Sequence, residues 1–259
     1  MSREKEYPRE LQPQSEAFPF DPLELTERTR EIVCDGSKRK YTDFYTVGVY
    51  GGIVTGYVVG CNLRCYFCWV GPGRDRPENR GKFYSAEQSA EKLLNIASNK
   101  GLEKARISGG EPTLCREHLM KLLDHLEEDG NLDTFILETN GILFGKESSY
   151  AQQLRRFDIP YVRVSLKTGF PNEWEEKTGA KQEYFELPFK AIEHLWQNEI
   201  DFHVAAMADP RITSREEMEK IYKKVAQVSR PLAEDIEWET VDMYPNTKKR
   251  LKHAGIDLE

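Results

Sequence analysis

The sequence lacks the features that place a protein in a membrane, outside the cell or on a nucleic acid. No apolar run follows the charged N-terminus MSREKEYPRELQPQ, so we expect no secretory signal peptide. Residues 44–63 carry no charge, but five glycines interrupt them, and the Gly-Gly pair between β-branched runs predicts a turn between two strands. The net charge of −7 excludes an overall basic surface for nucleic acid. We therefore expect a cytoplasmic protein without a membrane span.

Cysteine is scarce, and its distribution is uneven. Three of the five cysteines form the segment Cys61-x-x-x-Cys65-x-x-Cys68, while Cys34 and Cys115 lie far from them and from each other in the sequence. A disulfide uses two cysteines and a structural zinc site uses four ligands, so neither count fits three. Because thiols stay reduced in the cytoplasm, three neighbouring cysteines indicate metal binding or catalysis.

This spacing alone leaves two kinds of metal centre open. Three thiolates can hold a [4Fe–4S] cluster, which takes four ligands, and leave one iron open for a small molecule. A zinc ion would need a fourth ligand from elsewhere in the fold, such as a histidine, an aspartate, Cys34 or Cys115. Because zinc sites commonly repeat Cys-x-x-Cys in two halves, the spacing favours the cluster.

Short β-branched runs alternate with amphipathic stretches from residue 53 onward. Six alternations predict an α/β fold with parallel strands joined by right-handed crossovers, either as an open doubly wound sheet or as a barrel. Capping boxes at Ser85 with Gln88 and at Thr213 with Glu216 predict the starts of two helices. The strands are expected at Ile53–Val59, Ala105–Ser108, Thr134–Gly141, Tyr161–Lys167, Asp201–Met207 and Asp235–Met243.

Three parts are expected along the chain. Residues 1–45 are rich in Pro, Glu and Arg and form an N-terminal extension, in which only Leu23–Cys34 has a helical pattern. Residues 46–243 form the α/β domain, and residues 244–259 form a basic tail. The run Lys248–His253 in this tail is interpreted as a solvated helix end.

The predicted strands end in polar residues and glycines. Ser108–Pro112 follows the second core strand, Glu138–Gly141 ends the third and Ser165–Lys167 ends the fourth. Parallel strands bring their carboxyl ends to one edge of a sheet. These segments and the cysteine loop are therefore expected to form one shared site.

Two of these motifs together resemble one family. Cys61-x-x-x-Cys65-x-x-Cys68, with the aromatic Phe67 before its last cysteine, and the segment Ser108–Thr113 resemble the signatures of the radical S-adenosylmethionine (radical SAM) superfamily. The resemblance implies a partial (β/α)6 TIM-like barrel and a [4Fe–4S] cluster whose open iron binds S-adenosylmethionine. It implies an enzyme that forms a 5′-deoxyadenosyl radical, which abstracts hydrogen from a substrate. An electron donor such as flavodoxin or ferredoxin is implied as well.

The resemblance assigns roles to residues near the cluster. Cys61, Cys65 and Cys68 are the implied cluster ligands, and Phe67 is implied to lie near the adenine, although a place in the core also fits an aromatic. The motif after the second strand is implied to bind the cofactor. Its glycines let the backbone approach the methionyl amino group, and its last two residues shape the turn. These four residues are Gly109, Gly110, Glu111 and Pro112.

The later strands supply further candidates for cofactor binding. Ser165 and Lys167 point to the same side of their strand, and a lysine inside a barrel needs an anion, for which the methionyl carboxylate is a candidate. A lysine exposed at the strand end is the alternative. Glu138 and Thr139 resemble the acidic-Thr-Asn-Gly element of glycyl-radical activating enzymes. His203 is the last candidate, and a hydrogen-bonded core histidine is its alternative.

The loop Val70–Phe83 follows the cysteines directly. Its glycines, prolines and arginines fit a lid in which Arg74, Arg76 and Arg80 meet an anionic substrate. A solvent-exposed connection fits the same composition equally well.

The substrate is the open part of the functional prediction. The nearest overall resemblance, over Tyr50–Asp209, is to glycyl-radical activating enzymes, which implies a radical SAM enzyme that acts on a partner protein. The alternative is a radical SAM enzyme that modifies a nucleoside, nucleotide or other small molecule. A non-catalytic metal or electron-transfer protein is a hypothesis of a different class. Because only Cys34 and Cys115 remain for further centres, a single cluster is expected.

Overall fold

Six parallel strands form the centre of the fold, which confirms the predicted α/β class and partial barrel. The structure is a computed structural model that describes residues 6–10 and 16–257. The six strands are neighbours in chain order, and the sheet is not closed, because β9 lies at one end of it. Their bounds are β3 (Ile53–Val58), β5 (Lys104–Gly109), β6 (Thr134–Thr139), β7 (Pro160–Leu166), β8 (Phe202–Met207) and β9 (Glu237–Glu239).

Antiparallel strands extend the sheet beyond β3. β2 pairs with β3 up to Val47 opposite Ile53, so the predicted turn around Gly51 and Gly52 is confirmed. Within the described ranges, no helix is long and apolar enough to cross a membrane. The added elements are β1 (Cys34–Asp35), β2 (Lys38–Val47), β4 (Lys82–Ser85) and the 3-10 helix η1 (Val49–Gly51).

The predicted division of the chain stays a prediction, and residues 1–5, 11–15 and 258–259 lie outside the described residues. The first predicted boundary, between the N-terminal extension and the α/β domain, can be compared with the strands. The boundary at residue 45 falls inside β2, which pairs with β3 along its length. Leu25 and Val33 of the predicted extension are buried in the hydrophobic core. The described residues of this segment, from α1 to β2, therefore belong to the same packed body as the barrel.

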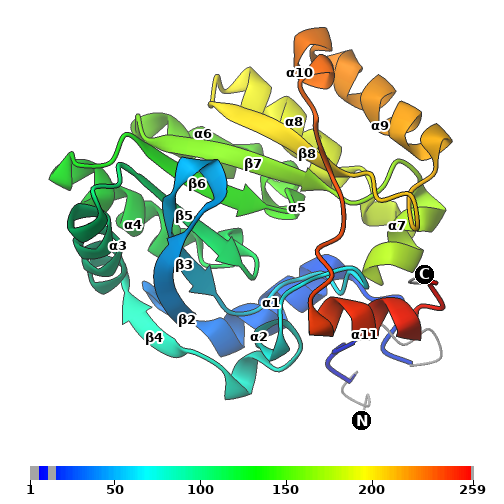
Figure 1. The fold of residues 1–259 in the computed structure, drawn as a ribbon, viewed down its shortest axis with the longest axis horizontal. Coiled ribbons are helices and arrows are strands. Elements are labelled where there is room, and N and C mark those ends of the chain that lie inside the picture. Colours follow the sequence, from blue (N-terminus) through cyan, green and yellow to red (C-terminus); the bar gives the residue numbers. More distant parts are fainter. Residues whose placement is uncertain (1–5, 11–15, 258–259) are drawn as a thin grey trace.

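Helices cover the outer side of the curved sheet, while α1, α2 and α11 gather below the sheet in the view of Figure 1. In this view the chain between α10 and α11 crosses the open side of the sheet. The helices are α1 (Pro22–Val33), α2 (Pro72–Asp75), α3 (Ala86–Lys100), α4 (Arg116–Asp129), α5 (Ile142–Lys146), α6 (Ser148–Gln152), α7 (Pro171–Thr178), α8 (Leu187–Gln197), α9 (Arg215–Val228), α10 (Arg230–Glu234) and α11 (Pro245–His253). Short 3-10 helices are η2 (Pro77–Asn79), η3 (Pro112–Leu114), η4 (Gln153–Arg156) and η5 (Gln182–Tyr184).

One of the two predicted helix starts is confirmed and the other is shifted. Ser85 and Gln88 form the capping box of α3, each side chain bonding the other's backbone N–H. The cap of α9 is Ser214, which accepts from the N–H of Glu217, and not Thr213. The N–H of Thr213 is still bonded to the carbonyl of Asp209, so the chain becomes extended only at Ser214.

Alternation along β7 separates the hydrophobic core from the barrel interior. Val162, Val164 and Leu166 are almost fully buried in the core. Arg163 and Ser165 lie on the opposite face, since successive side chains of a strand point to opposite sides. The interior of the barrel is therefore polar, whereas the layer under the helices is apolar.

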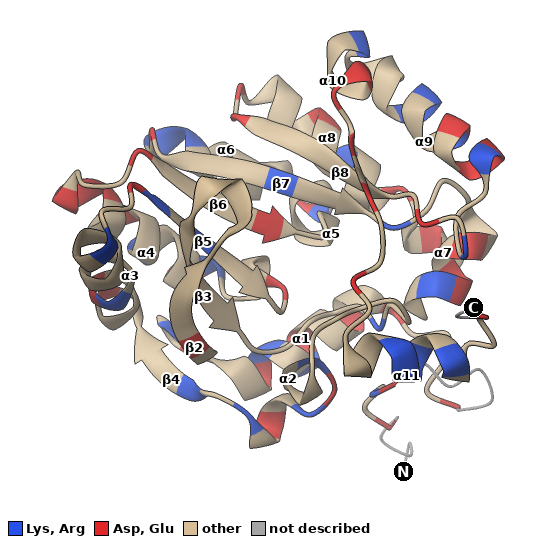
Figure 2. Cartoon of the chain, viewed as in Figure 1, with Lys and Arg blue, Asp and Glu red and all other residues tan. Residues whose placement is uncertain are grey.

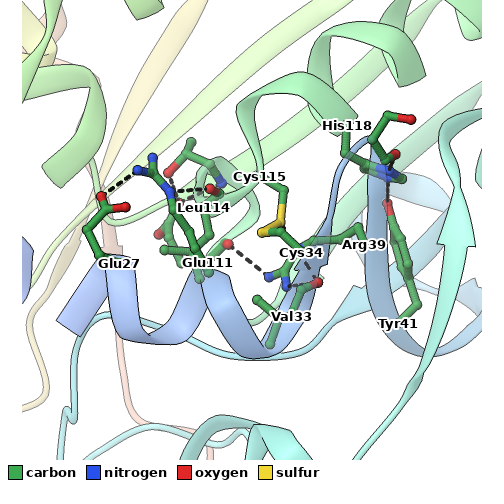
Figure 3. The surroundings of a disulfide bond; sticks show 12 residues. Glu27, Val33, Cys34, Arg39, Tyr41, Glu111, Leu114, Cys115 and His118 are labelled. Carbon is green, nitrogen blue, oxygen red and sulfur yellow. Dashed lines mark hydrogen bonds and ion pairs between the residues drawn. A yellow bond between two sulfur atoms is a disulfide. The ribbon is translucent and has the colours of Figure 1, made fainter. Parts of the chain in front are cut away.

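A disulfide joins Cys34 and Cys115, which corrects the expectation that all thiols stay reduced (Figure 3). Cys34 ends α1 and Cys115 precedes α4, so the bond links segments separated by 81 residues in the sequence. Beside it, Arg39 donates to the carbonyl of Glu111 (3.2 Å). The disulfide and this hydrogen bond hold the segment after β5 against α1 and β2.

Removal of the disulfide is expected to lower the stability of the protein. Closing a loop of 81 residues lowers the entropy of the unfolded chain by the equivalent of roughly 4 kcal/mol, or ~10 °C in melting temperature for a chain of this size. We expect Cys34→Ala/Cys115→Ala to melt lower by that amount in calorimetry without reductant. A phosphine reductant should lower the melting temperature of the wild type and leave the variant unchanged. Equal melting temperatures for the wild type and the variant, each with and without the reductant, would contradict the prediction.

Candidate functional site

The three cysteines of the loop after β3 are the free cysteines of the chain. Cys65 is buried, and Cys61 and Cys68 are half-buried. Burial, with the charges of Glu111 and Cys65, raises the pKa of Cys61 to about 12. Burial also raises the pKa of Cys65, while the charge of Lys167 opposes the rise and that of Cys68 adds to it. Such thiols become thiolates when a metal centre binds them, so binding releases protons.

The described part of the chain brings no fourth side-chain ligand to this loop. Cys34 and Cys115 are used in the disulfide, and among residues 6–10 and 16–257 no three His, Cys, Asp or Glu side chains gather to hold one metal ion. Zinc needs every ligand atom about 2.0–2.3 Å from one centre, whereas a cubane cluster spreads thiolates over separate irons. The donor set fits the predicted [4Fe–4S] cluster better than zinc. The histidines have other contacts: His118 with Tyr41, His125 with Glu128, His194 with Phe144, His203 with Glu237 and His253 with Glu10.

Three buried arginines hold the backbone of the cysteine loop. Each donates a hydrogen bond to the carbonyl oxygen of a different cysteine. Arg64 comes from the loop itself, Arg74 comes from α2 directly after it, and Arg250 comes from α11. The three bonds run from Arg64 Nη1 to Cys61 O (2.7 Å), from Arg74 Nη1 to Cys65 O (2.7 Å) and from Arg250 Nη1 to Cys68 O (2.6 Å).

The carboxylate of Asp75 joins these three arginines. Its Oδ1 accepts from Arg74 Nη2 (2.7 Å) and Nε (2.9 Å) and lies 3.8 Å from Arg64 Nε. Its Oδ2 accepts from Arg250 Nη2 (2.6 Å). Although burial opposes the charge, Asp75 and the thiols of Cys68 and Cys65 raise the pKa of Arg74. Arg74 is therefore a cation inside the protein.

The position of Arg74 corrects part of the prediction for the loop Val70–Phe83. Arg74 is 1% exposed in α2 and binds the backbone of the cysteine loop, so it is not available to a substrate. Arg76 and Arg80 are exposed, which fits either a lid or a solvated connection. Arg74 was predicted to meet a substrate together with Arg76 and Arg80, because a run of arginines in a loop does not show which of them is buried.

The sequence analysis also missed Arg64, Asp75 and Arg250. Arg250 was included in a run interpreted as a solvated helix end, but it is 5% exposed. A weak signal was present, because Thr247, Arg250 and Leu251 are three and four residues apart and share one buried face of α11. No spacing in the sequence connects Arg64 or Asp75 with that face.

The glycines of the motif after β5 let two backbone segments meet. Gly110 N–H donates to Val58 O (2.8 Å), and Glu111 N–H donates to Gly60 O (2.8 Å), directly before the cysteine loop. A Cβ on Gly110 would lie 2.2 Å from Gly60 O, and Gly109 has a φ of +93°, which favours glycine. Packing against the loop accounts for these glycines. An approach of the methionyl amino group stays a prediction.

Glu111 is 2% exposed and connects three segments of the site. Its Oε1 accepts from Thr113 Oγ1 and Thr139 Oγ1, both at 2.6 Å, and its Oε2 accepts from Asn140 N–H (2.9 Å). Asn140 Nδ2 donates in turn to Asn62 Oδ1 (2.8 Å) in the cysteine loop. Glu111 and Thr139 therefore fix the ends of β5 and β6 relative to the loop, and their contact with a cofactor stays a prediction.

Two other predicted cofactor residues are buried near the loop. Phe67 is 7% exposed, packs edge-on against Tyr66 at a centroid distance of 5.6 Å and belongs to the hydrophobic core. Pro112 is buried and begins η3. Their predicted roles, beside the adenine and in the turn, stay predictions, and the core alternative for Phe67 is compatible with its burial.

Ser165 lies near the carboxyl end of β7, and Lys167 directly follows the last residue of the strand; both residues are half-buried. Lys167 Nζ donates to Ser165 Oγ (2.5 Å), and in the described ranges it forms no ion pair with a carboxylate. The charge of Lys167 opposes the rise that burial causes in the pKa of Cys65. A cation without an anion beside the free thiols fits the predicted contact with a methionyl carboxylate.

Glu138 and His203 have protein partners inside the barrel. Glu138 accepts from Arg106 Nη1 (2.5 Å) and from Ser108 Oγ (2.5 Å). His203 is the second residue of β8, at the end of that strand away from its carboxyl terminus, and its Nε2 lies 2.9 Å from Glu237 Oε2. The structure thus brings Glu138 near the strand ends and leaves His203 apart from the cysteine loop. Cofactor binding by either residue stays a prediction.

Substitution of Gly110 is expected to disrupt the metal site. In Gly110→Ala the added Cβ would meet Gly60 O at 2.2 Å, so the backbone before Cys61 has to move and the ligands lose their arrangement. We expect the variant to retain little iron after anaerobic reconstitution, measured as protein-bound iron and sulfide. Gly48→Ala is the matched control, because a Cβ there meets no atom within 4 Å. Equal iron contents in the two variants would refute this prediction.

Solved structures share the fold of this chain. The structure of TYW1 with a lysine-pyruvate adduct aligns with a TM-score of 0.54 at 19% identity, covering 79% of this chain and 68% of that one. Streptococcus suis SuiB bound to S-adenosylmethionine aligns with a TM-score of 0.54 at 16% identity, covering 79% and 45%. HydG from Carboxydothermus hydrogenoformans, a maturase of FeFe-hydrogenase, gives 0.54 at 12% identity, covering 90% and 54%. At these identities the likeness shows the fold alone.

Relatives and a family model extend the likeness to the sequence. The chain is 31% identical over 198 residues to a probable GTP 3′,8-cyclase of Methanococcus vannielii, covering 76% of this chain and 60% of the relative. It is 33% identical over 135 residues to the GTP 3′,8-cyclase of Syntrophomonas wolfei, covering 51% and 40%. The chain therefore spans less than two thirds of the length of these relatives. The model of the radical SAM superfamily matches residues 57–225, more than half of the chain, and the protein belongs to this superfamily.

Proposed function

We propose that this radical SAM enzyme holds its [4Fe–4S] cluster with Cys61, Cys65 and Cys68 and acts on a small polar molecule of the nucleoside or nucleotide class. The cluster and S-adenosylmethionine follow from the family. The observation that supports the ligands is that these three thiols are free and lie on one loop, in which a buried arginine holds the backbone carbonyl of each cysteine. When bound, these cofactors supply a 5′-deoxyadenosyl radical that abstracts hydrogen from the substrate.

The residues of the chain bind and orient in this proposal. Lys167, with Ser165 beside it, binds the methionyl carboxylate, because its half-buried ammonium has no carboxylate partner among the described residues and can form a charge-assisted hydrogen bond. Glu111 and Thr139 keep the strand ends against the cysteine loop through their hydrogen bonds. The apolar layer under the helices keeps water away from the outer side of the sheet.

The barrel interior supports a polar substrate. Arg163 pairs with Glu237 (2.9 Å) and Glu239 (2.6 Å), and Arg106 pairs with Glu138 (2.5 Å), so charged groups of both signs line the strands. Such groups can exchange a protein partner for a hydrogen-bonding substrate. Relatives named GTP 3′,8-cyclase favour the nucleotide alternative of the sequence analysis over a partner protein.

Activation of a partner protein is the second candidate. Its support is the sheet that does not close at β9, since an open barrel can admit a peptide loop. A non-catalytic metal protein is not supported, because the chain belongs to a family of enzymes. A flavodoxin or ferredoxin as electron donor and a cytoplasmic location stay predictions.

Cleavage of S-adenosylmethionine tests the proposal. We expect the reconstituted, dithionite-reduced protein to form 5′-deoxyadenosine from S-adenosylmethionine and Cys65→Ala to form none, measured by chromatography and mass spectrometry. With nucleotides deuterated in the ribose, the true substrate should transfer deuterium to 5′-deoxyadenosine. Formation of 5′-deoxyadenosine without deuterium transfer from any nucleoside or nucleotide, but with a glycyl-radical protein, would replace the first candidate by the second.

The proposed role of Lys167 gives a binding prediction. Because a hydrogen bond between charged groups contributes roughly 1.5–3 kcal/mol, Lys167→Gln should weaken S-adenosylmethionine binding about 10- to 100-fold. The dissociation constant is measured by calorimetry on the reconstituted protein. Lys190→Gln, at an exposed position of α8, should bind as the wild type does. An unchanged constant in Lys167→Gln would exclude the carboxylate contact.

A further inference from the structure

One residue of the C-terminal helix α11 belongs to the surroundings of the cysteine loop. Arg250 Nη1 donates to the carbonyl oxygens of Cys68 and Val70, both at 2.6 Å, and Nη2 donates to Asp75 Oδ2 (2.6 Å). Basic side chains concentrate on α11 (Figure 2), and its lysines are exposed, whereas Arg250 is 5% exposed. The helix therefore directs one buried cation at a loop 182 residues earlier in the chain.

The buried charges around the loop do not balance within the described part of the chain. Arg64, Arg74 and Arg250 are almost fully buried, and their carboxylate partner is Asp75 alone. Arg64 Nη2 and Arg250 Nε also have no hydrogen-bond partner among the described residues. Buried cations that outnumber buried anions are costly unless a negative group lies nearby. Three thiolates bound to an iron–sulfur cluster are such a group, and each arginine already contacts the backbone of one of these cysteines.

We infer that Arg250 is a positioning residue of the iron–sulfur site, through which the C-terminal helix controls cluster retention and reduction potential. The inference rests on the proposed ligation by Cys61, Cys65 and Cys68. Its two carbonyl contacts fix the backbone of the last ligand and of the loop behind it. Its charge, added to those of the other two arginines, favours the reduced cluster, because net charge and hydrogen bonds around a cluster set its potential.

The test compares Arg250→Gln with Lys252→Gln in the full, reconstituted chain. Both changes remove one positive charge from α11, but Lys252 is exposed. With a ferrous-iron chelator in excess, we expect Arg250→Gln to lose its cluster roughly 10- to 100-fold faster than the wild type. Its midpoint potential, from a redox titration followed by electron paramagnetic resonance, should shift to a more negative value. Lys252→Gln should match the wild type in both measurements.

Arg250→Lys separates the charge from the geometry. Lysine keeps the cation but lacks the planar fork that reaches two carbonyls and a carboxylate at once. We expect its potential to return toward that of the wild type while its cluster is still lost faster. An unchanged potential in Arg250→Gln overturns the inference even if its melting temperature falls, because that result indicates a merely structural residue.

The remaining outcomes also decide the question. If Arg250→Gln does not fold, Arg250→Lys decides alone, and wild-type rates of cluster loss in that variant overturn the inference. If the wild type holds no cluster, the proposed ligation and this inference fail together. If the wild type holds a cluster and cleaves S-adenosylmethionine while Arg250→Gln behaves identically, only the inference fails.

Discussion

The cysteine loop depends on one buried carboxylate. Asp75 contacts three guanidinium groups, and without its negative charge those cations would repel one another inside the protein. Arg64 also donates to the carbonyl of Pro8, and Arg250 belongs to α11, so the carboxylate connects segments from both ends of the chain to the loop. These are the segments that composition alone assigns to an extension and a tail. In the structure, Pro8 and Arg250 from these segments contact the cysteine loop and the residues that hold it.

A second buried carboxylate organises the strand ends. Glu111 accepts from Thr139 and Asn140, and its own carbonyl accepts from Arg39. The disulfide at Cys115 anchors the same segment four residues later. The carboxylate of Glu111 is thus satisfied by protein partners, whereas the ammonium of Lys167 donates to Ser165 Oγ and has no carboxylate partner among the described residues. A half-buried ammonium with a hydroxyl as its hydrogen-bond partner is free to pair with an anionic ligand.

The family and the structure answer different parts of the functional question. Membership of the radical SAM superfamily establishes the type of enzyme and its cofactors, a [4Fe–4S] cluster and S-adenosylmethionine. The structure adds which backbone contacts hold the cysteine loop and shows that the barrel interior is lined by ion pairs such as Arg163 with Glu239. The substrate is proposed from these linings and from relatives that are longer than this chain. The polar lining argues for a hydrophilic substrate.

The sequence by itself determined the features that depend on neighbouring residues. These are the spacing of the three cysteines, the six strands in their order and the capping box of α3. Each cysteine spacing, strand or cap is recognised from residues that lie close together in the sequence. Only the tertiary structure decided the partners across long separations, such as Cys34 with Cys115 over 81 residues and Arg250 with Cys68 over 182. An arginine in a basic run has the same local pattern whether it is solvated or buried. Its role follows from the carbonyls and the carboxylate that the fold places beside it.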